Sequence, residues 1–191
     1  MTLSFSKLAG LIWLLFFAYW YLSAAFNKTN PERHESNLSR LFYIVLIGLA
    51  VFLFSFGPAM DGPLLWRFVP EGMFDKLLGL AILISGLCFA IWARLHLGRY
   101  WSGRISLAEN HQLIQTGPYR LVRNPIYCGG LIAVLGTAII IGEARAIPAF
   151  ILVLIALLYK INQEEKLLKE RFAREFTDYQ KEVKSLIPFI Y

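Results

Sequence analysis

Two polar stretches in the C-terminal half carry the residue types that could do chemistry. The first is the loop from Gly98 to Tyr127, which is too long and too mixed in composition to be a simple connector between membrane helices. A Gly-Pro pair at Gly117 marks a turn, and Pro125 suits the first turn of a following helix. Backbone amides at that helix start, assisted by Arg120 or Arg123, could hold an anionic ligand group such as a carboxylate.

The second stretch begins at Lys160, where two adjacent glutamates follow an apolar run. Glu165 lies on an apolar stripe with helical spacing, so we expect an inward-turned carboxylate near the membrane boundary. Such a group is unfavourable there unless it is paired or functional, and facing a cavity it would suit a cationic or hydroxyl-bearing ligand. The stripe predicts one continuous helix that includes Ile161, Leu168, Phe172, Phe176, Tyr179 and Val183.

Each stretch also has a plain structural interpretation. The basic loop could bind anionic lipid headgroups, with its tyrosines at the interface, although this leaves the Gly-Pro-Tyr turn unexplained. Glu164 could pair with Lys160, and Glu165 with Lys169, as ordinary i,i+4 ion pairs on a solvated helix. The apolar stripe makes this alternative weaker for Glu165 than for Glu164.

Five apolar runs must position these stretches. With 57% hydrophobic and 17% charged residues, the chain is more apolar than a soluble domain of its size requires. We expect an all-α integral membrane protein with a single membrane domain, residues 1–191, divided into N-terminal helices (1–76) and a catalytic region (77–191). The expected spans are 8–26, 41–57, 77–97, 126–142 and 147–161. The last two predict a tight helical hairpin, whose second helix continues as a charged helix beyond the membrane.

Positive charge predicts the orientation. Fifteen of the 19 Lys and Arg residues fall on the side that holds the 98–125 loop and the C-terminal tail. Because Lys and Arg accumulate in cytoplasmic segments, both polar stretches are expected to face the cytoplasm. The basic residues lie at the ends of apolar runs and form no stripe with interleaved aromatic residues, which argues against a nucleic-acid partner.

Familiar catalytic motifs are missing from the sequence. No Ser-His-Asp arrangement, HExxH, Walker loop or GxGxxG is present, which removes the commonest hydrolase, phosphoryl-transfer and Rossmann interpretations. Cys88 and Cys128 have neither CxxC spacing nor nearby histidines, so no metal site is expected.

At the two polar stretches the sequence resembles the isoprenylcysteine carboxyl methyltransferase family, together with its relatives among membrane phospholipid methyltransferases. The resemblance covers roughly the last half of the chain, and several ordered motifs at suitable separations make it specific. It is carried by Leu97-Gly98-Arg99-Tyr100-Trp101-Ser102, His111, Leu113, Gly117-Pro118-Tyr119, Arg123-Asn124-Pro125-Ile126-Tyr127, and Glu164-Glu165 with Leu168 and Phe172.

The resemblance implies a pocket where the cytoplasmic loop meets the C-terminal helix. S-adenosylmethionine would arrive from water, and a lipophilic or prenylated acceptor from the bilayer, most simply an isoprenylcysteine carboxylate. Residues expected to act in catalysis are Glu165, Glu164, Lys160 and Arg123. Carried over by position, the cofactor site would contain His111, Leu113, Gly117, Tyr119, Asn124, Pro125, Tyr127 and Glu164. We expect a multi-pass protein of a bacterial or archaeal plasma membrane, in contact with membrane lipids.

Four positions depart from the family pattern. Asn124 stands where the family usually has histidine, and it cannot titrate near neutrality, so a proton-shuttling role would be lost. Lys160 replaces the usual arginine, which exchanges a bidentate fork for a point charge. Ala173 and Phe176 replace the usual glycine and tyrosine, changes expected to affect the packing of the tail.

Other functions are open at this point. A carboxylate acceptor needs little acid–base help, whereas a phospholipid amine must first lose a proton, for which Glu165 or Glu164 is the expected base. A nicotinamide-dependent membrane reductase of the sterol-reductase type is a second alternative, disfavoured by the short chain. A third is a non-catalytic adaptor that contacts anionic lipid. The sequence does not determine the oligomeric state.

Overall fold

The structure, a computed structural model, describes residues 4–26, 36–57, 62–98, 101 and 113–188. These residues form five α-helices, one for each expected apolar run, so the all-α membrane fold is confirmed. Within them α1, α2, α3 and α5 are long and apolar enough to cross a membrane, whereas α4, with 17 residues, is shorter. The elements are α1 (Phe5–Phe26), α2 (Asn37–Ser55), η2 (Pro63–Leu65), α3 (Met73–Leu97), η4 (Gly117–Arg120), α4 (Pro125–Ile141) and α5 (Ala146–Glu182).

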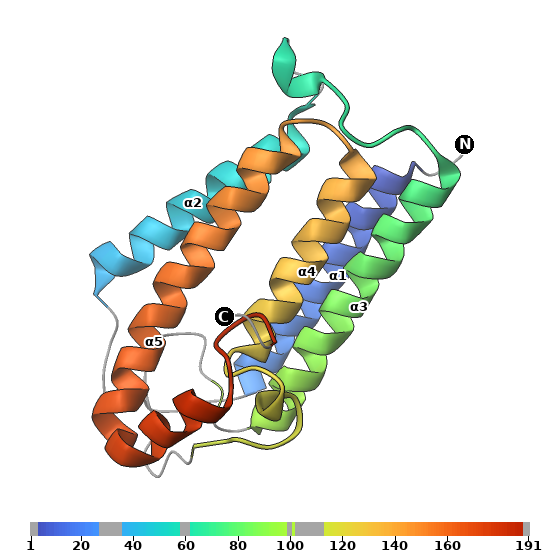
Figure 1. Ribbon diagram of the computed structural model, residues 1–191. Coiled ribbons are helices and arrows are strands. Elements are labelled where there is room, and N and C mark those ends of the chain that lie inside the picture. Colours follow the sequence, from blue (N-terminus) through green and yellow to red (C-terminus); the bar gives the residue numbers. More distant parts are fainter. Residues whose placement is uncertain (1–3, 27–35, 58–61, 99–100, 102–112, 189–191) are drawn as a thin grey trace.

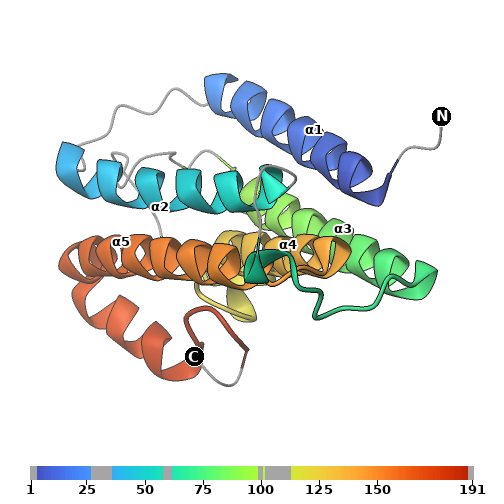
Figure 2. The ribbon, with the colours of Figure 1, turned by 90° about the horizontal axis from the view of Figure 1, so that it is seen from above.

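The helices pack as two antiparallel pairs (Figure 1). One pair is α3 with α4, and the other is α2 with α5, while α1 lies beside α3 and α4 and stands apart from α2 (Figure 2). The expected short turn between α4 and α5 exists, at residues 142–145. The predicted hairpin is therefore formed, and α4 and α5 share an apolar cluster, but it is not tight along its length, because each helix packs mainly against another helix.

Glycines allow α3 and α4 to touch through their backbones. A Cβ added to Gly86 would lie 2.6 Å from the carbonyl oxygen of Gly129, and one added to Gly136 would lie 2.5 Å from that of Gly79. Real side chains do not tolerate such distances, so only glycine fits at these positions. In lipid, where burial of apolar surface gives no driving force between helices, small residues that permit this approach favour association.

Helix α2 packs against α5, and a buried arginine binds one end of it. Ala50 of α2 and Ala156 of α5 are both buried. Arg145, only 6% exposed, donates to the carbonyl oxygens of Leu53 and Phe54 at the end of α2. These carbonyls lack partners within their own helix, and the helix dipole also favours a cation there. The arginine therefore fixes the position of α2 along α5.

Helix α5 extends beyond its apolar part, as predicted, but it is not continuous. The backbone of Ala173 has φ 39° and ψ −102°, and the chain turns at this residue. Residues 174–182 fold back at the lower end of the molecule in Figure 1, where they are drawn in red. The prediction of one stripe reaching Val183 is therefore wrong. Phe176 and Tyr179 are buried, but on a second helical segment that returns towards Glu165.

Candidate active site

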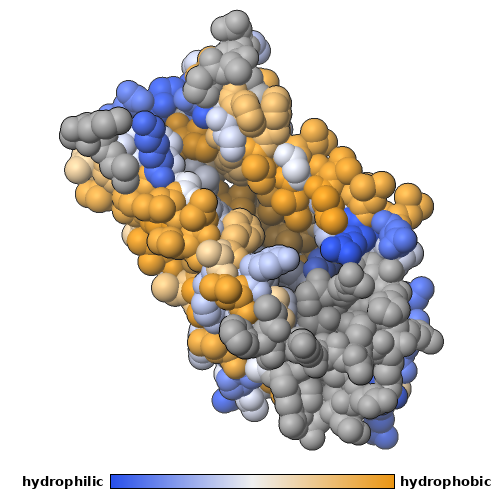
Figure 3. Space-filling model, turned by 180° about the vertical axis from the view of Figure 1, so that it is seen from behind, coloured by the Kyte–Doolittle hydropathy of each residue, from blue (hydrophilic) through white to orange (hydrophobic). Residues whose placement is uncertain are grey.

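A large apolar cavity lies between α1, α2, α4 and α5. Its volume is about 1060 Å³, and aromatic and aliphatic side chains form most of its wall. Seen from behind, the molecule is hollowed between two apolar flanks (Figure 3). Phe17 of α1 and Val51 of α2 both line the cavity and are more than half exposed. The cavity therefore opens sideways between α1 and α2, on a surface suited to lipid.

One end of the cavity is polar. The hydroxyl of Tyr127, on α4, donates to Oε1 of Glu164, on α5, at 2.6 Å. Nζ of Lys160 lies 3.9 Å from the same oxygen, 5.1 Å from the ring centre of Tyr43 and 5.8 Å from that of Tyr127. All four residues line the cavity. The anticipated Lys160–Glu164 ion pair is thus formed, but it lies at a cavity wall beside two aromatic rings instead of on a solvated helix face.

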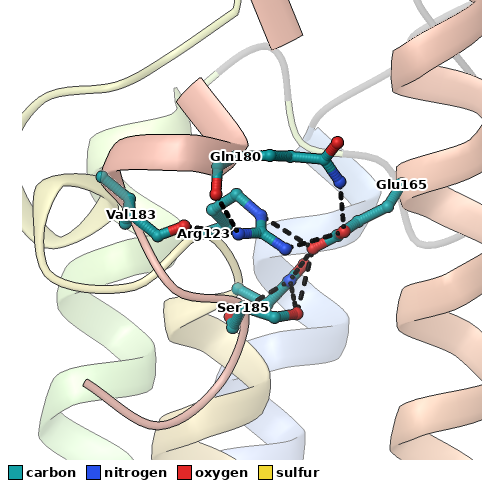
Figure 4. A network of polar contacts seen from close by, with 6 residues as sticks. Arg123, Glu165, Gln180, Val183 and Ser185 are labelled. Atoms are coloured by element: carbon teal, nitrogen blue, oxygen red, sulfur yellow. Dashed lines mark hydrogen bonds and ion pairs between the residues drawn. The ribbon is translucent and has the colours of Figure 1, made fainter. Parts of the chain in front are cut away.

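Glu165 is the centre of a hydrogen-bond network (Figure 4). Arg123 donates to both carboxylate oxygens, Nε at 3.1 Å and Nη2 at 3.0 Å, as a bidentate pair. Asn124 Nδ2 at 2.8 Å and Ser185 Oγ at 3.0 Å donate to Oε1. Gln180 Nε2 donates to Oε2 at 3.0 Å. Five donors from three parts of the chain therefore satisfy this single carboxylate.

This network sets the charge of Glu165, which lies beyond Ile161, where the apolar part of α5 ends. Burial raises the pKa of Glu165, but the hydrogen bonds and charge of Arg123, with the hydrogen bonds from Asn124 and Ser185, outweigh burial and hold the pKa below its ordinary value. The expected inward-turned carboxylate is thereby confirmed. The alternative pairing of Glu165 with Lys169 is wrong, because Arg123 takes that place.

The C-terminal segment closes over the start of α4. The backbone N–H of Arg123 donates to the carbonyl oxygen of Lys184 at 2.8 Å, and that of Asn124 donates to the carbonyl oxygen of Ser185 at 3.0 Å. Leu186, 1% exposed, packs into the apolar cluster around α4 and α5. The segment that follows the break in α5 is therefore part of the site.

Sequence reasoning missed Gln180 and Ser185, because a continuous helix would have carried both away from Glu165. One signal could have located the turn that returns them. Ala173 occupies a position where the family usually has glycine, and a residue that adopts positive φ is the usual reason for such a glycine.

The Gly-Pro-Tyr turn is built against α3 and the end of α5. Gly117 has φ 59°, and a Cβ there would lie 2.7 Å from Cε1 of His96. The His96 ring stacks on that of Tyr119, with centres 6.4 Å apart, and the hydroxyl of Tyr179 donates to the carbonyl oxygen of Tyr119. Burial raises the pKa of Tyr119 above its ordinary value, so this phenol stays neutral. The turn thus connects the cavity wall to the C-terminal helix.

The structure brings most of the anticipated site residues together around the polar end of the cavity. Gly117 is an exception, because it packs against His96 and does not line the cavity. His111 lies outside the described residues. The individual roles stay predictions. The anticipated residues that line the cavity are Leu113, Tyr119, Arg123, Asn124, Pro125, Tyr127, Lys160, Glu164 and Glu165.

Comparisons with known proteins identify the family. The model of the isoprenylcysteine carboxyl methyltransferase (ICMT) family matches residues 78–170. A probable protein-S-isoprenylcysteine O-methyltransferase of Oryza sativa subsp. indica is 32% identical over 172 residues, which cover 88% of this chain and 87% of the rice protein. The chain belongs to the ICMT family. It is therefore a member of a family of membrane methyltransferases.

Two further comparisons extend the similarity to one solved structure and one bacterial protein. A solved structure of the eukaryotic intramembrane Ras methyltransferase ICMT matches with a TM-score of 0.52 and 25% identity, over 80% of this chain and 52% of that one. The chain thus spans about half the length of that ICMT. The cobalt-zinc-cadmium resistance protein CzcN of Cupriavidus metallidurans is 31% identical over 62% of this chain and 53% of its own length.

Proposed function

We propose that the protein transfers the methyl group of S-adenosylmethionine to the carboxylate of an isoprenylcysteine or a similar lipophile. The observation that carries this proposal is the continuity of the cavity. Its apolar walls open between α1 and α2, and the same space ends at Lys160, Glu164 and Tyr127. An oily chain and an anionic head match these two parts, and membership of a methyltransferase family supports the reaction type.

The reaction depends mainly on the positioning of the carboxylate against the methyl donor. S-adenosylmethionine, when bound, would supply an electrophilic methyl group on a sulfonium. A carboxylate oxygen forms the new C–O bond while the C–S bond breaks and the thioether leaves, so no proton has to move. Holding reactants at attack distance can lower a barrier by roughly 7–11 kcal/mol. Asn124 in place of the usual histidine is compatible with such a reaction, because nothing at that position needs to titrate.

Lys160 and Glu164 are proposed to face the two charged reactants. Among the described residues, the Lys160 ammonium lies beside the rings of Tyr43 and Tyr127 and 3.9 Å from a carboxylate oxygen of Glu164, which is longer than a hydrogen bond, so it keeps N–H donors for an anionic head. Glu164, oriented by the hydroxyl of Tyr127, provides negative charge for the cationic cofactor. A cation for the acceptor and an anion for the donor thus lie side by side.

Arg123 and Glu165 are proposed to position the site without contacting the reactants. Each satisfies the other, and further partners occupy the remaining atoms of both side chains. A carboxylate with five donors and a lowered pKa is a poor base. We therefore disfavour the use of Glu165 as a base for an amine acceptor and assign it to holding α4, α5 and the C-terminal segment together.

For the cofactor we propose the wall formed by Leu113, Tyr119, Pro125 and Tyr127, which lies beside Glu164. Asn124 completes this wall, and His111 is retained as a sequence-based prediction. We also propose that this end of the protein faces the cytoplasm, on the strength of the charge distribution along the chain. A bacterial or archaeal plasma membrane stays a prediction, and the rice relative comes from a plant.

A binding experiment tests the choice of cofactor. The purified full-length protein is heated with S-adenosylhomocysteine or with NADPH, since a ligand that binds only the folded state raises the melting temperature by mass action. We expect stabilisation by S-adenosylhomocysteine alone. Stabilisation by NADPH alone would instead favour the reductase alternative.

A transfer experiment tests the choice of acceptor. The protein is incubated with methyl-labelled S-adenosylmethionine and either N-acetyl-S-farnesylcysteine or phosphatidylethanolamine in lipid nanodiscs. We expect label in the cysteine carboxylate as an ester that base hydrolyses. Label only in the phospholipid amine would show that the N-methyltransferase alternative is correct.

A further inference from the structure

Helix α2 contributes an aromatic residue to the polar end of the cavity. This helix lies outside residues 78–170, which the family model matches. Tyr43, near the start of α2, is 8% exposed and lines the cavity. Its ring centre lies 5.1 Å from Nζ of Lys160. An ammonium within about 6 Å of an aromatic face is attracted by the ring quadrupole. Helix α2 therefore takes part in the electrostatics of the site.

Lys160 has a particular need for such a partner. A lysine ammonium is a point charge on a flexible stem, whereas the arginine usual at this position has a planar fork that its partners can hold. Glu164 lies too far from Nζ for a hydrogen bond and already accepts the hydroxyl of Tyr127 at 2.6 Å. The rings of Tyr43 and Tyr127 flank the ammonium, and the Lys160 side chain is 17% exposed, so solvent screens these attractions only partly.

The position of Tyr43 is fixed by the packing of α2 on α5. At the far end of this helix pair, Arg145 holds the last carbonyls of α2, and a Cβ at Gly57 would lie 2.2 Å from its guanidinium carbon. At the near end, the ring of Phe42 lies 4.8 Å from that of Tyr159. The Arg145 contacts set the register of α2 on α5, and in that register Tyr43 faces Lys160 while Phe42 faces Tyr159.

We propose that Tyr43 is a positioning residue, which holds the Lys160 ammonium in place for the anionic head of the acceptor. The inference rests on the proposed function and deepens it, because it assigns recognition of the acceptor to the α2–α5 interface. Recognition of the cofactor remains on the side of α4 and the loop before it.

The test compares two neighbouring aromatic residues of α2. Tyr43→Leu removes the ring beside Lys160, Tyr43→Phe keeps that ring, and Phe42→Leu removes a ring that contacts Tyr159 instead. For each variant in nanodiscs we measure the Kd of N-acetyl-S-farnesylcysteine without cofactor, the Kd of S-adenosylhomocysteine, the melting temperature, and KM and kcat for methyl transfer.

We expect Tyr43→Leu to weaken acceptor binding and raise KM by about 3- to 30-fold, the range that corresponds to a cation–π interaction. Tyr43→Phe and Phe42→Leu should each change the acceptor Kd and KM by no more than about twofold relative to the unchanged protein. All three should bind S-adenosylhomocysteine normally, and kcat should change less than KM, because the chemistry is not touched.

Two results would overturn the inference. One is an equal loss of acceptor binding in Tyr43→Leu and Phe42→Leu, which would mean that the ring only packs. The other is a loss of S-adenosylhomocysteine binding in Tyr43→Leu with acceptor binding unchanged, which would place the ring on the cofactor side. If the unchanged protein binds but does not methylate the acceptor, the proposed function fails, and the acceptor Kd values still decide the role of Tyr43.

Discussion

The α3–α4 pair and the region between α1 and α2 are made of equally apolar helices, yet the first is closed and the second is open. Along α3 and α4 the facing residues are glycines, and the two backbones touch. Where α1 and α2 face the cavity, large residues such as Trp13 and Phe16 on α1 and Phe54 on α2 stand among small ones such as Ala9 and Ala50. In lipid, burial of apolar surface does not draw helices together, whereas facing glycines let two backbones touch.

The same contrast recurs between two adjacent carboxylates. Glu165 is satisfied by five donors from the loop, the end of α5 and the C-terminal segment. Glu164 lines the cavity, where it accepts the hydroxyl of Tyr127 and lies 3.9 Å from the Lys160 ammonium. The closed region and the Glu165 network form a scaffold, and ligands are expected in the open region, which has Glu164 at its polar end.

The largest effect is expected from disrupting the backbone contact between α3 and α4. Gly86→Leu would drive a side chain into the backbone of α4, where a Cβ alone already lies 2.5 Å from the nitrogen of Ala133. Overpacking of cores commonly costs about 1–3 kcal/mol, and more is expected when the obstacle is backbone. The variant should lose its monodisperse peak in detergent and its cooperative melting transition.

Gly48→Leu is the matched control for that change. Gly48 is exposed on α2, and a Cβ there meets nothing within 4 Å. We expect this variant to elute and melt like the unchanged protein. If both variants behave alike, the glycine contact does not hold the scaffold.

Removal of the satisfied carboxylate should come next in size. Glu165→Ala leaves the Arg123 guanidinium, 10% exposed, without its bidentate partner. Breaking such a buried pair typically costs about 3–5 kcal/mol. The C-terminal segment should detach first, which is detectable as faster hydrogen exchange at residues 183–188. Unchanged exchange there would contradict the role of Glu165 as the centre of the network.

Glu164→Gln should affect activity and leave stability almost intact. The amide oxygen still accepts the hydroxyl of Tyr127, but the negative charge proposed for the cofactor is lost. We expect methyl transfer to fall about 10- to 100-fold, equivalent to roughly 1.4–2.7 kcal/mol, with a melting temperature within about 2 °C of the original. Glu165→Gln, measured in parallel, should show the opposite pattern, with a larger effect on the melting temperature than on methyl transfer. A large loss of melting temperature in Glu164→Gln would remove the distinction between the two glutamates.

The smallest effect is expected at the break in α5. Alanine with φ 39° is strained, and glycine relieves that strain at some entropic cost. Ala173→Gly should therefore raise stability by about 0.5–1 kcal/mol. Ala81→Gly, at an exposed position inside α3, should lower it by a similar amount. A loss of stability in both variants would mean that the turn at Ala173 is not held in the native state.

Hydrophobic run length was enough to predict the helices, and ordered motifs were enough to predict most of the cavity's polar end. Lys160, Glu164 and Tyr127 are brought together as expected, because helical spacing places the first two on one face and the loop returns the third. The pairing of the helices was not predictable from run length, since it depends on which faces carry Gly86 and Gly129. The turn at Ala173 depends on the backbone conformation of one residue, which helical periodicity does not reveal, so only the glycine usual at that position could have indicated where Gln180 and Ser185 lie.

A cavity block tests the central claim most directly. Ile47→Trp adds bulk inside the cavity, whereas Ile44→Trp, also on α2 and exposed, adds it outside the cavity. Both are assayed for transfer of labelled methyl from S-adenosylmethionine to N-acetyl-S-farnesylcysteine, beside binding of S-adenosylhomocysteine. We predict at least tenfold slower transfer in Ile47→Trp with unchanged cofactor binding, and normal transfer in Ile44→Trp. Full activity in Ile47→Trp would contradict the claim that the acceptor reaches the cofactor through this cavity.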